Sequence, residues 1–270
     1  MMETQNSPDT TFSSVLASLA PRGDAFRADP PEAWRQGRTL FGGLAASLAL
    51  QSALKKFAEL PTLRSAQLAF VGPASGILDF SPVLLRRGKS TAFVGVEGLA
   101  DGEPALVATF VFGASRLSQH VYRGAPMPDV AMPGDALPSF FDSPLAPRFT
   151  GQFEAFRVGD VRPFSGAATP KLELWLRHRD AAAPDDIRSL VALADVPPPA
   201  ALAMFVAGHA ISTVTWSFDV LCERFGGSGW HFMQIEAETV GEGYSSQRMM
   251  LWDTAGAAVL AARQTIAIFG

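Results

Sequence analysis

Two distant segments of the chain share one layout of strand-like runs and glycine turns. Residues 77–113 contain three such runs, with Gly88 in the first turn, and end in the letters VFG. Residues 232–270 repeat this order, with Gly243 in the first turn, and end in IFG. Three consecutive strands joined by short glycine turns predict an antiparallel meander. A chain that carries the meander twice is therefore constrained to a fold with two similar halves.

The parallel extends upstream of each meander. Further strand-like runs occupy residues 63–72 and 211–220, and a stretch rich in Ala and Leu precedes each of them, at 41–60 and 184–205. In the first of these stretches the large apolar residues recur near helical spacing and most other positions are Ala or Gly. This pattern predicts a helix that is buried on most of its faces, as it would be inside a wrapped sheet.

The two copies are separated by a long connection without periodicity. Residues 116–150 are rich in proline and polar residues, which predicts an ordered linker that crosses the surface. We therefore expect an N-terminal unit over 1–115 and a C-terminal unit over 151–270, each a curved antiparallel sheet around a central helix. Additional strands expected at 152–158 and 172–179 make the second unit the more complete one. The predicted class is α+β.

Composition excludes several classes of protein. Of 270 residues, 48% are apolar and 18% are charged, which allows a sizeable core, and the net charge of −4 argues against nucleic-acid binding. The single cysteine, Cys222, rules out an internal disulfide and suits a reducing compartment. The N-terminus lacks the pattern of a signal peptide, and no apolar run approaches the roughly 20 residues of a membrane span. We expect a cytoplasmic protein.

One carboxylate stands out in the second Ala-rich stretch. Asp195 is the only charged residue in LVALADVPPPAALAMF, residues 190–205. The proline run 197–199 predicts that one helix ends near Asp195 and that another begins just after it, which puts the carboxylate at or near a helix N-terminus. Free amides there favour the ionised form, whereas burial opposes it. A helix cap and a catalytic group both remain possible from these residues alone.

The ordered set of motifs resembles the acyl-CoA thioesterase II family. LFGGLAASLALQSALKK is similar to the family's helix entry, and LWLR at 174–177 and PDDIRSLVALAD at 184–195 follow the family in order and spacing. The resemblance implies a double hotdog fold, hydrolysis of an acyl-CoA thioester to free acid and coenzyme A, and three catalytic residues. By position in the motifs these residues are Asp195, Thr213 and Gln264.

These three residues suit hydrolysis without a protein nucleophile. Asp195 would orient and deprotonate a water, with Gln264 and Thr213 holding it, and an amide near a helix N-terminus would polarise the carbonyl. The scheme requires no metal and no redox cofactor. By alternation, Thr213 is expected on the strand face that carries Thr215 and Ser217. The candidate substrate-binding residues are Gly42, Gly43, Thr215, His209 and Arg224.

Two other functions remain open at this stage. The first is an enoyl-CoA hydratase or dehydratase on the same fold, which usually needs an Asp–His pair in one short motif, and no histidine follows Asp195 at such spacing. The second is a non-catalytic binder of acyl-CoA or another lipophilic ligand. Arg86, Arg87 and Lys89 form a basic cluster that is either a solvated turn or a contact for the phosphates of coenzyme A. We also expect a homo-oligomer, most simply a dimer.

Overall fold

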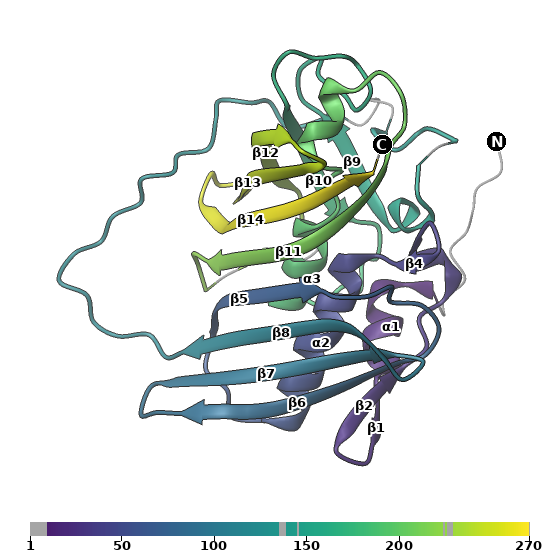
Figure 1. The fold of residues 1–270 in the computed structure, drawn as a ribbon. Helices are drawn as coiled ribbons and strands as arrows, with labels where there is room; N and C mark the ends of the chain where they lie inside the picture. The colour runs from purple at the N-terminus through teal and green to yellow at the C-terminus, as the bar shows by residue number, and fades with distance from the viewer. Residues whose placement is uncertain (1–9, 135–138, 145, 224, 226–228, 270) are drawn as a thin grey trace.

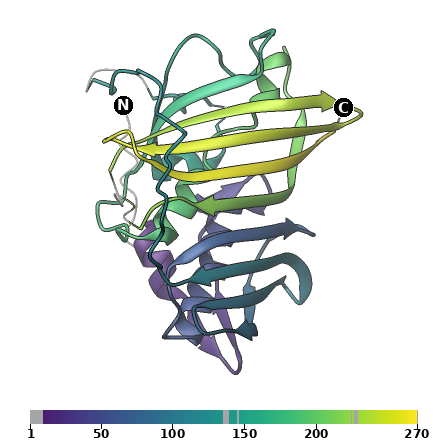
Figure 2. The same cartoon turned by 90° about the vertical axis from the view of Figure 1, so that its left-hand side faces the viewer.

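The computed structural model describes residues 10–134, 139–144, 146–223, 225 and 229–269, and its main feature is one antiparallel sheet of twelve strands. The sheet curves around two helices that lie on its inner face (Figure 1, Figure 2). The strand order is β1-β2-β6-β7-β8-β5-β11-β14-β13-β12-β10-β9. Read from the two outer edges toward the centre, this order has the same connectivity in both halves, as the repeated sequence layout predicts.

Within the described residues, the first half supplies six strands of the large sheet and two α-helices. Its central helix is α2 (Gly42–Lys56), and α1 (Phe12–Ser18) lies beside it. The strands are β1 (Ala20–Arg22), β2 (Ala25–Ala28), β5 (Leu63–Phe70), β6 (Leu78–Arg87), β7 (Thr91–Ala100) and β8 (Glu103–Gly113). A separate two-stranded ribbon, β3 (Arg35–Gln36) and β4 (Thr39–Leu40), and the short 3₁₀ helix η2 (Glu32–Trp34) precede α2.

The second half repeats the arrangement. Its central helix is α3 (Ile187–Ala194), followed by the 3₁₀ helix η4 (Ala200–Met204), and η3 (Arg148–Gln152) leads into the first strand. The strands are β9 (Phe153–Arg157), β10 (Lys171–His178), β11 (Ala210–Val220), β12 (His231–Gly241), β13 (Tyr244–Asp253) and β14 (Ala258–Phe269). The strands and helices expected at these places are therefore present, with ends that differ by a few residues.

The expectation that the second half is the more complete one is wrong. β1 and β2 extend the first half beyond β6, just as β10 and β9 extend the second half beyond β12. Strands as short as β1 and β2 show too few alternations to be recognised by periodicity. Each half thus contributes six strands to the sheet.

The halves are joined edge to edge. β5 of the first half pairs with β11 of the second, in a register that aligns Ala69 with Thr215 and Ser65 with Asp219. This pairing removes two sheet edges that would otherwise expose unpaired backbone groups. The two curved sheets predicted from the sequence are therefore one continuous sheet.

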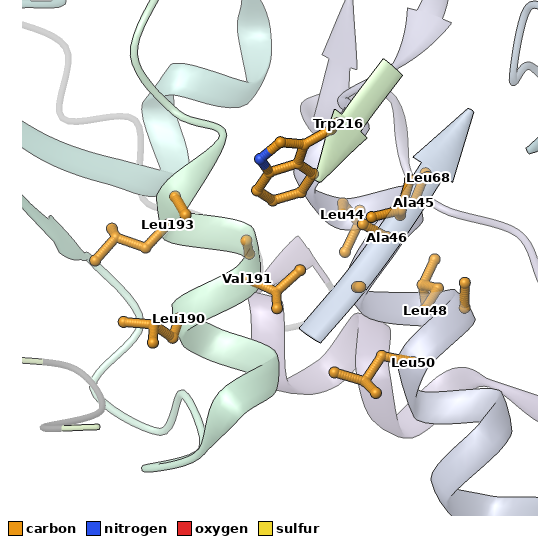
Figure 3. Close-up of a cluster of buried hydrophobic side chains, with 14 of the residues drawn as sticks. Leu44, Ala45, Ala46, Leu48, Leu50, Leu68, Leu190, Val191, Leu193 and Trp216 are labelled. Carbon is orange, nitrogen blue, oxygen red and sulfur yellow. The ribbon is translucent and has the colours of Figure 1, made fainter. Parts of the chain in front are cut away.

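The two central helices pack against each other at close range. The Ser47 hydroxyl on α2 donates to the backbone oxygen of Arg188 on α3 at 3.0 Å, and the Arg188 guanidinium donates to Gln51 Oε1 at 2.6 Å. Gly43 allows the approach, because a Cβ there would lie 2.7 Å from the backbone oxygen of Ala192. Figure 3 shows Trp216 of β11 between the helices, close to apolar side chains from both halves. None of the described helices is long and apolar enough to cross a membrane.

The connection between the halves loops away from the sheet and then returns to its outer face (Figure 1). Met127 and Val130 pack there against a small cluster of Trp175, Phe232 and Trp252. The indole nitrogens of Trp252 and Trp175 donate to the backbone oxygens of residues 125 and 131, both at 2.9 Å. These contacts explain how a segment without regular structure is ordered on the surface.

Candidate active site

Asp195 lies at the end of α3, where its backbone caps the helix C-terminus. The expectation that it sits at the N-terminus of the following helix is wrong, because the chain passes through the proline run before η4 begins at Ala200. Proline disfavours the helical conformation in the residue before it, which accounts for the gap. α3 does end where the sequence predicts, and the segment that follows contains only a short 3₁₀ helix.

The helix N-terminus beside Asp195 is instead that of α2, from the other half of the chain. The carboxylate accepts a hydrogen bond from the backbone N–H of Gly43. The side chain of the N-cap residue Phe41 makes no hydrogen bond to the first turn of α2. The Asp195 carboxylate therefore supplies an acceptor for an amide that has no partner within the helix. A Cβ at Gly42 would lie 2.8 Å from Asp195 Oδ2 and 3.3 Å from the Phe70 ring. Glycine at this position lets the helix end approach the carboxylate.

Gln264 completes the contacts of the carboxylate. Its Nε2 donates to Asp195 Oδ1 at 2.6 Å, across 69 positions of sequence. Gln264 lies on the inner face of β14, where Ala262 and Ile266 are its buried neighbours, and only 4% of its surface is exposed. The alternation in the sequence predicted this face, and the amide there finds the partner that burial demands.

The position of Thr213 differs from the sequence expectation. A β-bulge in β11 places one extra residue between Thr213 and Thr215, so that Thr213 pairs with Ile266 while Trp216 pairs with Gln264. Because paired residues share a face of the sheet, Thr213 lies on the inner face with Gln264. The expectation that it shares the face of Thr215 is wrong, since simple alternation does not hold through a bulge.

The environment of Asp195 favours its protonated form. Burial raises the pKa of this carboxyl from 3.8 to about 7, and the hydrogen bonds from Gln264 and Gly43 oppose the rise. In the described structure no charged side chain forms an ion pair with Asp195. The shift therefore has a single dominant cause, which is the loss of water around the carboxylate. A group with this pKa exchanges protons readily near neutral pH.

The predicted binding residues differ in their surroundings. Gly42 and Gly43 lie against Asp195, as described above. Thr215 is exposed, and His209 packs its ring against Phe205 at 4.6 Å between centroids. Arg224 lies outside the described residues.

One residue beside the site was missed by sequence reasoning. Gln247 on β13 is fully buried, and its Nε2 donates to Gln264 Oε1 at 2.8 Å. Its own Oε1 accepts from the backbone N–H of Ala200 at 3.0 Å. A signal was available, because Gln247 interrupts an inner-face row in which Met249 and Leu251 are apolar.

Two other features of the described residues lie apart from this site. A groove of about 510 Å³ is found on the second half, lined by residues such as Asp219, Arg248 and Arg263. Arg248 and Arg263 pair with each other in register and are exposed, so they belong to the outer face, opposite Gln264. No cluster of three or more His, Cys, Asp or Glu side chains in the described part of the chain is arranged to hold a metal ion.

Solved structures share this fold over nearly the whole chain. A hot dog fold protein from Alicyclobacillus acidocaldarius has a TM-score of 0.87 at 24% identity, with 96% of this chain and 98% of that chain covered. A putative thioesterase from Novosphingobium aromaticivorans has a TM-score of 0.78 at 23% identity, covering 94% and 99%. An acyl-CoA thioesterase II from Mycobacterium marinum has a TM-score of 0.75 at 20% identity, covering 96% and 98%. The architecture is thus the double hotdog that the sequence resemblance implies.

Family models identify both halves of the chain. Residues 30–113 match the acyl-CoA thioesterase N-terminal domain, and residues 125–268 match the acyl-CoA thioesterase C-terminal domain. The chain therefore belongs to the acyl-CoA thioesterase family, and it is a thioesterase. No curated protein matches the sequence.

Proposed function

We propose that the protein hydrolyses an acyl-CoA to a free acid and coenzyme A, with Asp195 as the general base. The observation that supports this most is the convergence of three elements on one carboxylate. The end of α3 carries it, the first turn of α2 donates Gly43 N–H, and β14 donates Gln264 Nε2 at 2.6 Å. A pKa near 7 lies in the range that general-base catalysis favours at neutral pH.

The reaction proceeds by direct attack of water on the thioester. Ionised Asp195 accepts a proton from the water as its oxygen bonds to the carbonyl carbon, and the carbonyl oxygen becomes an oxyanion. The oxyanion then re-forms the carbonyl as the carbon–sulfur bond breaks. The proton held by Asp195 passes to the departing sulfur, so that the products are the free acid and the thiol of coenzyme A.

Three groups near Asp195 assist the reaction. A backbone amide in the first turn of α2 stabilises the oxyanion, because first-turn amides have no partner within the helix and lie at the positive end of its dipole. Gln264 holds the carboxylate in position and presents its second amide hydrogen to the water. Thr213, on the same inner face as Gln264, offers a hydroxyl for the same water.

A hydratase on this fold is less well supported. Of the four histidines, all of them described, His120 is exposed and His209 packs on Phe205, while His178 bonds to the backbone oxygen of Ser189 and His231 to those of Gly229 and Phe225. None of these contacts involves Asp195. The Asp–His pair that such an enzyme usually needs therefore has no counterpart beside this carboxylate.

Thiol release from a panel of short, medium, long and aromatic acyl-CoAs tests the proposal. Asp195→Asn should lower the rate at least about 10²-fold while the fold is retained, as expected for the loss of a general base. Asp219→Asn, which changes an exposed aspartate on β11, is the matched control and should keep the wild-type rate. Binding of acyl-CoA without thiol release by the wild type would reject hydrolysis, and a hydrated acyl-CoA product would point to the hydratase.

Self-association forms a further part of the proposal. Val83, Leu85, Phe93 and Val107 on the outer face of β6, β7 and β8 are between 36% and 58% exposed. This group, here called the apolar strip, lies between Arg86, which pairs with Phe93, and Glu97, which pairs with Val107. A second copy related by a two-fold axis would cover the strip and set the basic end of one copy against the acidic end of the other.

A further inference from the structure

A line of hydrogen bonds runs from the backbone of η4 to Asp195. Ala200 N donates to Gln247 Oε1 at 3.0 Å, Gln247 Nε2 donates to Gln264 Oε1 at 2.8 Å, and Gln264 Nε2 donates to Asp195 Oδ1 at 2.6 Å. The two glutamines are opposite each other on neighbouring strands. Both are buried, with Gln247 fully enclosed and Gln264 4% exposed.

The direction of this line is set at its backbone end. A carboxamide has an oxygen that accepts and a nitrogen that donates, and the two ends have nearly the same shape, so neighbours decide which way it faces. A backbone N–H can only donate, which makes the Gln247 oxygen face Ala200. The Gln247 nitrogen must then face Gln264, and the Gln264 nitrogen must face Asp195.

We propose that Gln247 is a positioning residue of the active site, which fixes the direction of the Gln264 carboxamide and thereby keeps its N–H groups toward Asp195. The inference rests on the proposed role of Asp195 as the base. The line begins and ends on one short segment, since Ala200 and Asp195 flank the proline run 197–199. Gln247 and Gln264 together therefore tie the two ends of this segment to the inner face of the sheet, Gln247 at Ala200 and Gln264 at Asp195.

Loss of the Gln247 side chain has a defined chemical consequence. Without Gln247, the Gln264 oxygen loses its donor partner, and the carboxamide can rotate so that this oxygen accepts the O–H of protonated Asp195. An oxygen facing a carboxylate disfavours the ionised form, whereas the N–H that faces it now lowers the pKa of Asp195. A variant without the Gln247 amide should therefore keep Asp195 in its protonated, inactive form up to a higher pH.

Gln247→Met is the first variant to test, because it keeps a long unbranched side chain and removes the amide. We expect kcat for thiol release to fall about tenfold with KM changed much less, and the midpoint of the pH profile of kcat/KM to move upward. Gln234→Met is the matched control, since Gln234 lies half-buried on the outer face of β12 and bonds to Glu173 at 2.7 Å. That control should leave kcat and the pH profile as in the wild type.

Gln247→Glu gives a sharper test of direction. An ionised glutamate accepts from Ala200 N–H but cannot donate, so the Gln264 nitrogen should turn toward it and the Gln264 oxygen toward Asp195. The midpoint of the pH profile should then rise further than in Gln247→Met. A role limited to packing would lower the melting temperature of both variants without this ordered shift of the pH profile.

Ala200→Pro provides a test that leaves Gln247 unchanged, in case its substitutions prevent folding. Proline removes the N–H donor and places a ring carbon on the same nitrogen, and it suits the first position of a short helix after Pro199, whose φ of −54° and ψ of 134° it tolerates. This variant should also raise the midpoint. A wild-type pH profile in Gln247→Met and Ala200→Pro would overturn the inference while Asp195→Asn remained inactive, whereas an active Asp195→Asn would instead reject the proposed function.

Discussion

At the scale of single residues, the chemistry of this site comes from surroundings rather than from residue type. The carboxyl of Asp195 has its pKa raised from 3.8 to about 7 by burial at the junction of α2, α3 and β14. His178 is also buried, and burial lowers its pKa to about 4, but it bonds to the backbone oxygen of Ser189 within an aromatic cluster and contacts no part of the site. Burial shifts the pKa of both groups, but only Asp195 lies where the proposed reaction would use the shift.

The raised pKa of Asp195 makes the stability of the protein depend on pH. Between pH 4 and pH 7 the unfolded chain has released this proton and the folded chain has not, so this group lowers the free energy of unfolding as pH rises through that window. Asp195→Asn lacks the effect. The free energy of unfolding of the variant minus that of the wild type should increase from pH 4 to pH 7 and level off above it.

The size of this difference should be about 1 to 3 kcal/mol, since each unit of pKa shift corresponds to about 1.4 kcal/mol and remaining solvent access screens part of it. Urea titrations at a series of pH values measure it. Asp219→Asn, at an exposed position, serves as the reference. A difference that stays flat over the window would show that Asp195 ionises as an ordinary carboxyl.

At the scale of elements, spacing in the sequence predicted more than alternation did. The meanders, α2 and α3 all follow from turn spacing and helical periodicity. Thr213 was placed on the wrong face, because the bulge in β11 depends on pairing with β14 and has no signature in the run itself. The helix N-terminus beside Asp195 was assigned to the helix after the proline run, whereas it belongs to α2. A pattern of neighbouring residues in the sequence does not show contacts between the two halves. Gln247 had a signal, since it precedes the apolar residues Met249 and Leu251 in the alternating buried row of β13, but the sequence does not show its partner.

Gly42→Ala tests the closeness of α2 to the carboxylate. The added Cβ would lie 2.8 Å from Asp195 Oδ2, so the carboxylate or the helix must move. Activity should fall about 10- to 100-fold, because small displacements of reacting groups are costly. The melting temperature should change little, because alanine is the better helix former.

Gly151→Ala is the control for this substitution. A Cβ at Gly151 meets no atom within 4 Å, so both activity and melting temperature should remain at wild-type values. Full activity in Gly42→Ala, measured by thiol release, would contradict the account of how α2 meets Asp195.

At the scale of the whole molecule, two similar halves build one asymmetric site. The first half supplies the N-terminus of α2, and the second supplies Asp195 and Gln264, while the pairing of β5 with β11 holds the halves together. The outer faces differ as well. The connection covers part of the second half through Met127 and Val130, whereas the apolar strip of the first half stays exposed.

The apolar strip carries a prediction about assembly. Phe93→Glu places a charge in the middle of the proposed contact and should convert a dimer to a monomer, as measured by light scattering coupled to size exclusion. Tyr244→Glu changes an exposed aromatic residue on the second half, 55% exposed, and should leave the dimer intact. A wild type that is monomeric at all concentrations, or a dimer unaffected by Phe93→Glu, would contradict this arrangement.

The most direct measurement of the central claim is the pH dependence of kcat/KM for thiol release by the wild-type protein. A base whose pKa is about 7 predicts a rate that rises with pH on the acid side, reaches half of its maximum near pH 7 and levels off above it. A rate that is already constant from pH 5 upward would show that the base ionises like an exposed carboxyl, and it would contradict the assignment of Asp195 to this role.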